Sequence, residues 1–377
     1  MTVGFAYSPA LDAYDLGPGH PFRPERVSLT AALLADYGVL GPGALAPLTF
    51  DPATPDALLR VHDEEYLRAV RAASHAPGSW PGGRGIGPGD TPAFAGMHEA
   101  SAAIAGATCA ALSRVLEGRH DRAFAPAGGL HHAHRERAAG FCVYNDVAIA
   151  IAAALERDPG LRVCYLDIDA HHGDGVQEAF YQEPRVLTIS LHEDGRYLYP
   201  GTGSWRERGA GPGTGTVLNL PMPPYADDRC YLYAFEQAVA PAVRAFAPGI
   251  LVTQNGADGH WSDPLTTLGL TIQGYEALYA RITTLADETC GGRIVACGGG
   301  GYSWLTVVPR IWTLLAASLL EHDLPDELPD AWRQRVREVG GDPPTHLRHD
   351  PGPTLDDETR ERVWHDTGLM LRQALAG

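Results

Sequence analysis

The sequence predicts a single α/β domain of three layers (α/β/α), in which a mainly parallel sheet lies between two layers of helices. Short apolar runs recur along the chain, and most are followed by a polar or glycine-rich loop and then by apolar residues at helical spacing. The chain has 377 residues and 45% hydrophobic content, so it can bury one large core. No linker interrupts it. We therefore expect one domain over residues 1–324, with residues 325–377 as a C-terminal extension packed on the same domain.

The N-terminal part of the chain predicts one strand, two helical segments and a loop. Residues 3–7 form a short apolar run, and residues 27–37 and 56–73 carry apolar positions at helical spacing. Residues 77–89 are dense in glycine and proline, which indicates a surface loop. Asp90 then opens a long alanine-rich helix to about residue 116, where its carboxylate could simply serve the first turn. Arg26 opens the helix over 27–37 and fits either a surface position or an internal channel for an anion.

Polar or glycine-rich residues follow directly after each of four later predicted strands. The strand at 123–126 precedes His131 and His132, and the strand at 163–166 precedes a stretch rich in aspartate and histidine over 166–175. The strand at 250–253 is followed by Asp258, and the strand at 294–297 gives way to four glycines and Tyr302. Because the carboxyl ends of parallel strands meet at one edge of a sheet, we expect these side chains to converge.

Asp169, His171 and Asp258 are the predicted metal ligands. Two carboxylates and one neutral imidazole balance the charge of a dication, and three protein ligands leave a coordination position for water or substrate. The alternative, salt-bridged core carboxylates with a capping histidine, is disfavoured because an unpaired buried charge costs several kcal/mol.

The remaining polar groups suit proton transfer. His131 and His132 are candidate acid and base groups, with Asp167 and Asp174 as the carboxylates that orient their rings. Tyr302 follows a four-glycine turn and can direct its hydroxyl at a developing oxyanion. Together with a metal site, this set predicts hydrolysis of an amide.

The net charge and the cysteines indicate which partners and which cellular compartment to expect. The net charge is −17, which disfavours nucleic acid as a partner and favours a cationic substrate or partner. The six cysteines form no Cys-x-x-Cys pair, and most lie in apolar runs, as in a reduced cytoplasmic protein. No uncharged apolar run reaches about 18 residues. We expect a cytoplasmic protein with neither a membrane nor a nucleic acid as its partner.

Taken together, these motifs resemble the zinc-dependent histone deacetylases of the arginase/deacetylase superfamily. The likeness spans about residues 3–320, in the family's own order. Within the family, residues 19–26, 90–92 and 258–265 resemble the bacterial acetoin-utilisation deacetylases most. The motifs that carry the likeness are Gly128-Gly129-Leu130-His131-His132, Gly140-Phe141-Cys142, residues 167–176, Pro200-Gly201-Thr202-Gly203, Gly256-Ala257-Asp258 and residues 298–302.

The resemblance implies the arginase/deacetylase fold and hydrolysis of the acetyl amide of N-acetyl-lysine in proteins. It implies that zinc is bound by Asp169, His171 and Asp258, although the sequence leaves ferrous iron open. His132 would be the general base and acid, with His131 as its electrostatic partner. Tyr302 would polarise the acetyl carbonyl.

The resemblance also implies a narrow substrate tunnel and a second cation. Phe141 and Tyr199 would form the tunnel walls with Gly140 beside them, Asp90 would hold substrate backbone amides at the rim, and Arg26 would lie at an internal acetate-exit cavity. Potassium would lie behind the zinc. Its implied ligands are Asp167, Asp169, Ser190 and backbone oxygens including those of His171 and Leu191.

Three alternatives to a mononuclear protein deacetylase differ in the number of metal ions, in whether the protein is catalytic, and in the substrate. A binuclear manganese ureohydrolase needs a second Asp-x-Asp pair, but Asp258 is followed by Gly259 and His260. A non-catalytic acetyl-lysine binding protein would not need the full set of catalytic groups. Acetylated polyamines and other small amides compete with an acetylated protein as the substrate, and the sequence does not specify the oligomeric state.

Overall fold

A parallel sheet of eight strands forms the centre of the computed structural model, which describes residues 2–41 and 43–376. The order of the strands is β2-β1-β3-β8-β7-β4-β5-β6, and every neighbouring pair is parallel. The strands are β1 (Val3–Phe5), β2 (Leu45–Pro47), β3 (Arg122–Ala125), β4 (Val163–Asp167), β5 (Val186–Glu193), β6 (Val217–Met222), β7 (Ile250–Gln254) and β8 (Ile294–Cys297).

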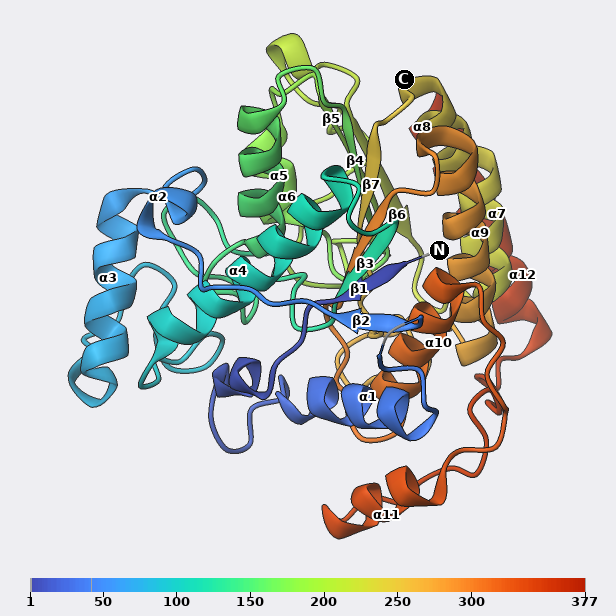
Figure 1. Ribbon diagram of the computed structural model, residues 1–377. Coiled ribbons are helices and arrows are strands. Elements are labelled where there is room, and N and C mark those ends of the chain that lie inside the picture. The colour runs from blue at the N-terminus through green and yellow to red at the C-terminus, as the bar shows by residue number, and fades with distance from the viewer. Residues whose placement is uncertain (1, 42, 377) are drawn as a thin grey trace.

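Helices cover both faces of this sheet (Figure 1). Figure 1 shows α4, α5 and α6 on one side and α7, α8, α9 and α12 on the other. The three-layer α/β/α architecture predicted from the sequence is therefore confirmed. The α-helices are α1 (Glu25–Asp36), α2 (Pro55–Leu58), α3 (Glu64–His75), α4 (Met97–Leu116), α5 (Asp146–Arg157), α6 (Asp174–Phe180), α7 (Asp228–Ala234), α8 (Ala240–Phe246), α9 (Ile272–Cys290), α10 (Val308–Leu320), α11 (Asp330–Glu338) and α12 (Asp357–Leu375).

The central strands are apolar because helices cover both of their faces. Every residue of β4, β5 and β7 is buried, as expected for a parallel sheet between two helical layers. In β4 and β7 the strongly polar residues come at the carboxyl ends, at Asp167 and Gln254, whereas β5 also carries Thr188 and Ser190 within the strand. The core therefore ends where the candidate site begins.

Two expectations for the N-terminal half were wrong in detail. The helical spacing over 56–73 covers two helices, because Asp63 accepts a hydrogen bond from the backbone of Tyr66 and caps a new helix there. The alanine-rich helix begins at Met97 and not at Asp90, since Gly96 adopts a left-handed conformation (φ 77°) just before it. Asp90 therefore lies outside the helix and does not serve its first turn.

The C-terminal segment is more helical than its sequence pattern indicated. It contains α11 and α12, and α12 packs on β6 and α7. On α11, Trp332 is fully buried and its indole N–H donates to the backbone oxygen of Leu29 in α1 at 3.0 Å. No helix within the described residues is both long enough and apolar enough to cross a membrane.

The burial of Trp332 makes the docking of α11 testable. Trp332→Ala should lower the free energy of unfolding by about 3–5 kcal/mol, because it leaves a large cavity and removes the indole hydrogen bond to α1. Urea denaturation of the full chain would measure this. The exposed neighbour Gln334 provides the control, since Gln334→Ala should change the same quantity by less than about 0.5 kcal/mol. Equal stabilities of the two variants would contradict the docking.

Candidate active site

Four adjacent strands carry the candidate site at their carboxyl ends. Strands β3, β8, β7 and β4 are neighbours in the sheet, so the loops that follow them lie together. These loops supply His131 and His132 after β3, Tyr302 after β8, Asp258 after β7, and Asp169 and His171 after β4. The convergence expected from the strand pattern is present in the structure.

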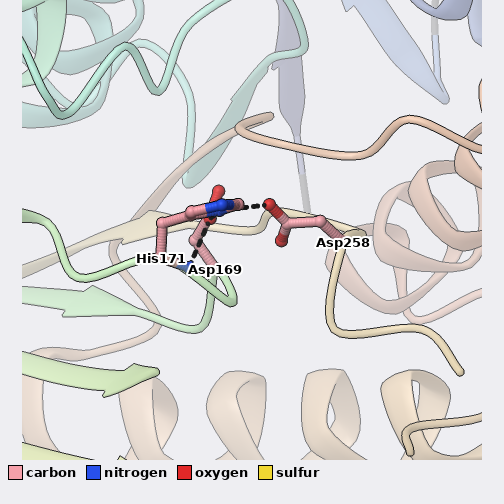
Figure 2. Close-up of side chains that lie close together, drawn as sticks. All are labelled: Asp169, His171 and Asp258. Carbon is pink, nitrogen blue, oxygen red and sulfur yellow. Dashed lines mark hydrogen bonds and ion pairs between the residues drawn. The ribbon is translucent and has the colours of Figure 1, made fainter. Parts of the chain in front are cut away.

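Asp169, His171 and Asp258 form a buried cluster that could hold a metal ion (Figure 2). One potential ligand atom from each residue lies within 4.8 Å of the other two. The Nδ1 atom of His171 is 2.9 Å from Asp258 Oδ2 and 3.1 Å from Asp169 Oδ1. Figure 2 shows both carboxylates directed at this imidazole.

The chain itself orients both carboxylates. Asp169 Oδ2 accepts the side-chain amide N–H of Gln254 at 2.6 Å and the backbone N–H of Gly300 at 2.7 Å. Asp258 Oδ1 accepts the backbone N–H of Ala170 at 2.9 Å. Asp258 therefore keeps Oδ2 for the centre of the cluster, and Asp169 directs Oδ1 there while this atom also accepts the backbone N–H of His171 at 2.9 Å. Outer hydrogen bonds orient the ligands of metal sites in this way.

The donor set fits a divalent cation. Two carboxylates share a buried space with one imidazole, and burial together with the charge of Asp169 raises the pKa of Asp258. A cation between the three residues would remove that repulsion and compensate the loss of water around the charges. Two oxygens and one imidazole nitrogen suit Zn²⁺ or Fe²⁺.

Two histidine–aspartate pairs lie beside the cluster. His131 Nδ1 is 2.8 Å from Asp167 Oδ2, and His132 Nδ1 is 2.7 Å from Asp174 Oδ1. The Nε2 atoms of the two histidines are 3.1 Å apart. The structure thus pairs each histidine with the carboxylate that the sequence analysis assigned to it.

The two imidazoles differ in charge state. Burial disfavours both charged rings, but the nearby carboxylates of Asp167 and Asp169 raise the pKa of His131 to about 9. Burial and the charge of His131 lower the pKa of His132 to about 4. At neutral pH, His132 is therefore the uncharged ring that can accept a proton. Burial would raise the pKa of Asp174, but its contacts with the histidines hold it well below its ordinary value.

Close backbone approach explains two of the glycines at the site. Gly140 has φ 52°, and a Cβ atom there would lie 2.2 Å from Cδ2 of His132. A Cβ atom at Gly300 would lie 2.1 Å from Oδ2 of Asp258. Any side chain at these two positions would displace the adjacent histidine or aspartate.

Tyr302 lies at the edge of the same cluster. Its ring is 6.4 Å from the ring of His171 and 5.8 Å from that of Phe141, centroid to centroid. Its backbone N–H donates to Asp263 Oδ2 at 2.8 Å. Burial raises the pKa of Tyr302 well above its ordinary value, so the phenol stays protonated and can donate a hydrogen bond.

The predicted tunnel residues flank the histidines. Tyr199 is partly exposed, and its ring centroid is 5.2 Å from that of His132, while Phe141 contacts Tyr302. A small cavity lies beside the two histidines and Asp169, and neither Phe141 nor Tyr199 is among its lining residues. Its lining includes His131, His132, Gly140, Asp169, Gly300 and Tyr302.

Asp90 is exposed, and its carboxylate contacts the chain itself. Asp90 Oδ2 accepts the backbone N–H of Gly140 at 2.8 Å and the hydroxyl of Thr91 at 3.1 Å. It therefore holds the residue that packs against His132, a role that the sequence analysis did not anticipate. Its binding of substrate amides stays a prediction.

Arg26 is fully buried, so the surface alternative for this residue is wrong. Its guanidinium carbon lies 3.8 Å from the ring centroid of Phe22, and its NH1 group donates to the backbone oxygen of Gly301 at 3.4 Å. Its Nε atom has no hydrogen-bond partner in the part of the chain that the structure describes. A buried guanidinium with a free donor suits an internal anion.

The residues implied for potassium lie at the ends of β4 and β5. Asp167 pairs with Ser190 in the sheet register, and Leu191 follows Ser190. The Ser190 hydroxyl is 2.8 Å from Nδ1 of His192. Potassium binding there stays a prediction.

Sequence reasoning missed several supporting residues. Gln254 ends a buried strand, which is a detectable signal because a buried amide needs partners. Asp263 lies only five residues after Asp258, within a motif already singled out. His134 also went unnoticed, although its Nε2 is 3.2 Å from Asp174 Oδ2.

Comparison with known proteins agrees with this geometry. A family described as histone deacetylase domain matches residues 20–319. The chain is 42% identical over 330 residues to the acetoin utilization protein AcuC of Bacillus subtilis (strain 168), which covers 87% of this chain and 84% of that protein. It is 38% identical over 336 residues to AcuC of Staphylococcus xylosus, covering 88% and 86%. The crystal structure of an HDAC homolog from Aquifex aeolicus matches with a TM-score of 0.83 and 28% identity, over 97% of this chain and 99% of that chain.

Removal of one carboxylate tests the metal site directly. Asp258→Asn should weaken Zn²⁺ binding by more than about 100-fold, because loss of a ligand should exceed the effect usual for outer hydrogen-bond partners. Competition with a chromophoric chelator would measure the affinity. Asp357→Asn, in the exposed first turn of α12, is the matched control and should bind Zn²⁺ as the wild type does. Wild-type affinity in Asp258→Asn would exclude this residue as a ligand.

Proposed function

Because the chain belongs to the histone deacetylase family, we propose that it hydrolyses the acetyl amide of N-acetyl-lysine in proteins and releases acetate and free lysine. One observation carries this proposal: Asp169 of the buried Asp-His-Asp cluster, the two carboxylate-paired histidines His131 and His132, and Tyr302 all line one small cavity. This set combines a Lewis-acid site, a proton acceptor and an oxyanion donor, which hydrolysis of an amide requires.

Asp169, His171 and Asp258 would hold Zn²⁺ or Fe²⁺. When bound, such an ion polarises the acetyl carbonyl and makes water more acidic. Gln254 and Gly300 support this role from outside, because their N–H groups fix the orientation of Asp169. We also propose a potassium ion behind this site, with Asp167, Asp169, Ser190 and the backbone oxygens of His171 and Leu191 as its ligands.

His132 would act first as general base and then as general acid. Its ring is uncharged at neutral pH, and Asp174 contacts its Nδ1 atom, so Nε2 is the nitrogen that carries the lone pair. That Nε2 atom lies 3.1 Å from Nε2 of His131, so proton transfer to water requires this contact to give way. It would take a proton from the attacking water and later deliver it to the leaving amine. His131, charged and held by Asp167, would stabilise the negative charge that develops nearby.

Tyr302 would bind the developing oxyanion. Its hydroxyl stays protonated, and its position is fixed through the backbone bond to Asp263. In a site closed to water, a single fixed donor of this kind is a large part of catalysis.

Two features of the entrance support an acetylated protein as the substrate. The aromatic rings of Phe141 and Tyr199 can flank a neutral acetyl-lysine side chain without desolvating a charge. The exposed carboxylate of Asp90 can accept backbone N–H groups of a peptide, which a polyamine lacks. The net charge of −17 favours the alternative, an acetylated polyamine or another small acetylated amine.

The biological setting is part of the proposal. The relatives from Bacillus subtilis and Staphylococcus xylosus carry the name acetoin utilization protein, and we infer the same setting for this chain. All six cysteines are free thiols, which supports work in the reducing cytoplasm.

Loss of the tyrosine hydroxyl tests the chemistry. Tyr302→Phe should lower kcat for an acetyl-lysine peptide by about 100-fold or more, the usual effect of losing one oxyanion donor. Zn²⁺ affinity should be unchanged, because the hydroxyl is not among the predicted ligands. Steady-state kinetics and chelator competition on the same samples would check both. Near-normal kcat would remove Tyr302 from the mechanism.

Asp90 tests the substrate class. Asp90→Asn keeps an oxygen for Gly140, so it isolates the role of the charge toward substrate. The variant should lower kcat/KM for acetyl-lysine peptides by about tenfold, as expected for weaker hydrogen bonds to a charged acceptor. Hydrolysis of an acetylated polyamine should change far less. Equal losses on both substrates, or a wild-type preference for the polyamine, would favour the small-amine alternative.

A further inference from the structure

A carboxylate from the C-terminal extension reaches the loop that follows Asp258. The Asp350 side chain is only 2% exposed, and its Oδ2 atom accepts the Nε2–H of His260 at 2.6 Å and the backbone N–H of Ile272 at 3.0 Å. Its Oδ1 atom accepts the indole N–H of Trp261 at 2.7 Å. One carboxylate thus satisfies three donors from a segment about 80–90 residues earlier in the chain.

Hydrogen bonds on both ring nitrogens orient His260 toward Asp350. Nδ1 of His260 accepts the backbone N–H of Ser262 at 3.2 Å, which leaves the proton of a neutral ring on Nε2, facing Asp350. Burial would raise the pKa of Asp350, but the bond from His260 and its further donors hold that pKa well below its ordinary value. Asp350 is therefore an anion that its donors stabilise.

The loop that Asp350 holds carries a metal-site residue at its start. His260 comes two residues after Asp258, and the His260 backbone N–H contacts the oxygen of Ala257 at 3.3 Å. A displacement of His260 would therefore also displace the backbone on both sides of Asp258.

The same loop also holds the catalytic tyrosine. The backbone N–H of Asp263 donates to the oxygen of His260 at 2.8 Å, and Asp263 Oδ2 accepts the backbone N–H of Tyr302 at 2.8 Å. One residue further, the Ser303 hydroxyl donates to the backbone oxygen of Ser262 at 3.0 Å. Contacts therefore continue from the extension, through residues 260–263, to Tyr302.

The segment before Asp350 is anchored independently. The NH1 group of Arg310, on α10, donates to the backbone oxygens of His346 at 3.3 Å, Leu347 at 3.4 Å and His349 at 2.9 Å. Helix α10 follows Tyr302 in the chain. Asp350 is therefore presented from a fixed backbone rather than from a free tail.

We propose that Asp350 is a positioning residue for the active site. Through His260 and Trp261, it fixes the loop that directs Asp258 into the metal cluster and that holds Tyr302 by its backbone. The C-terminal extension is then part of the catalytic unit. The effect of Asp350 on kcat rests on the proposed deacetylase function, whereas its effect on Zn²⁺ affinity does not.

The test uses full-length Asp350→Ala. Zn²⁺ affinity, measured by chelator competition without substrate, should fall by about 10-fold to 100-fold, the range seen when outer partners of metal ligands are removed. On an acetyl-lysine peptide, kcat should fall by about tenfold or more while KM changes by less than about threefold, because Asp350 does not contact substrate. Asp350→Asn keeps one acceptor oxygen and should recover part of both losses.

Two further variants separate positioning from stability. Asp326 also belongs to the extension, but its side-chain bond stays within it: Asp326 Oδ1 accepts the backbone N–H of Arg348 at 2.9 Å. The bond from the Leu347 N–H goes to the backbone oxygen of Asp326, which alanine retains. Asp326→Ala should lower the Tm yet leave Zn²⁺ affinity and kcat at wild-type values. His260→Ala should reproduce the losses of Asp350→Ala, and the double variant should be no worse than either, because the two residues act as a pair.

The outcomes are distinct. Wild-type Zn²⁺ affinity and kcat in Asp350→Ala, with only a lower Tm, would overturn the proposal. If Asp350→Ala does not fold, Asp350→Asn takes its place, and wild-type values of both quantities in that variant together with His260→Ala would overturn the proposal equally. If the wild type has no deacetylase activity, the proposed function fails, but the Zn²⁺ affinities still decide whether Asp350 positions the cluster.

Discussion

The burial of charge at one edge of the sheet is the constraint on which the rest of the site depends. Asp167, Asp169, Asp174 and Asp258 are all buried within a short distance of one another, and such charges are costly away from water unless they are paired. The protein meets this constraint with imidazoles, backbone N–H groups and the Gln254 amide. The parallel order β3-β8-β7-β4 makes this compensation feasible, because it brings four loop segments to one edge.

The same buried charges give two adjacent histidines different protonation states. His131 and His132 are neighbours in sequence and each has a carboxylate at Nδ1, yet their pKa values are displaced in opposite directions. The difference arises because His131 also lies near Asp169, while His132 lies near the charge of His131. One imidazole is then held as a cation and the other as a proton acceptor, which a single histidine could not provide at one pH.

The sequence predicted those parts of the site that follow strand ends, and missed those that depend on distant contacts. Asp169, His171 and Asp258 were predictable because parallel strands place their carboxyl ends together. The buried state of Arg26 was one of two open alternatives, since a residue at a helix start carries no signal of what covers it. Asp90 was assigned to a helix that begins only at Met97, because the alanine-rich pattern hid the left-handed Gly96. Asp350 lies 90 residues from His260, and no periodicity links such residues.

Asp90 at the entrance and His132 in the site both contact Gly140. This shared contact limits which substitutions the site tolerates. Asp90 accepts the backbone N–H of Gly140, and Gly140 leaves no room for a Cβ atom beside His132. A rim carboxylate that binds substrate amides would therefore pull on the same backbone that fixes the general base. If Asp90 binds substrate and His132 transfers protons, as proposed, the two roles are coupled through the peptide group of Gly140. On the proposed function, we expect a substitution of Asp90 to change turnover as well as binding unless the new side chain still accepts the Gly140 N–H.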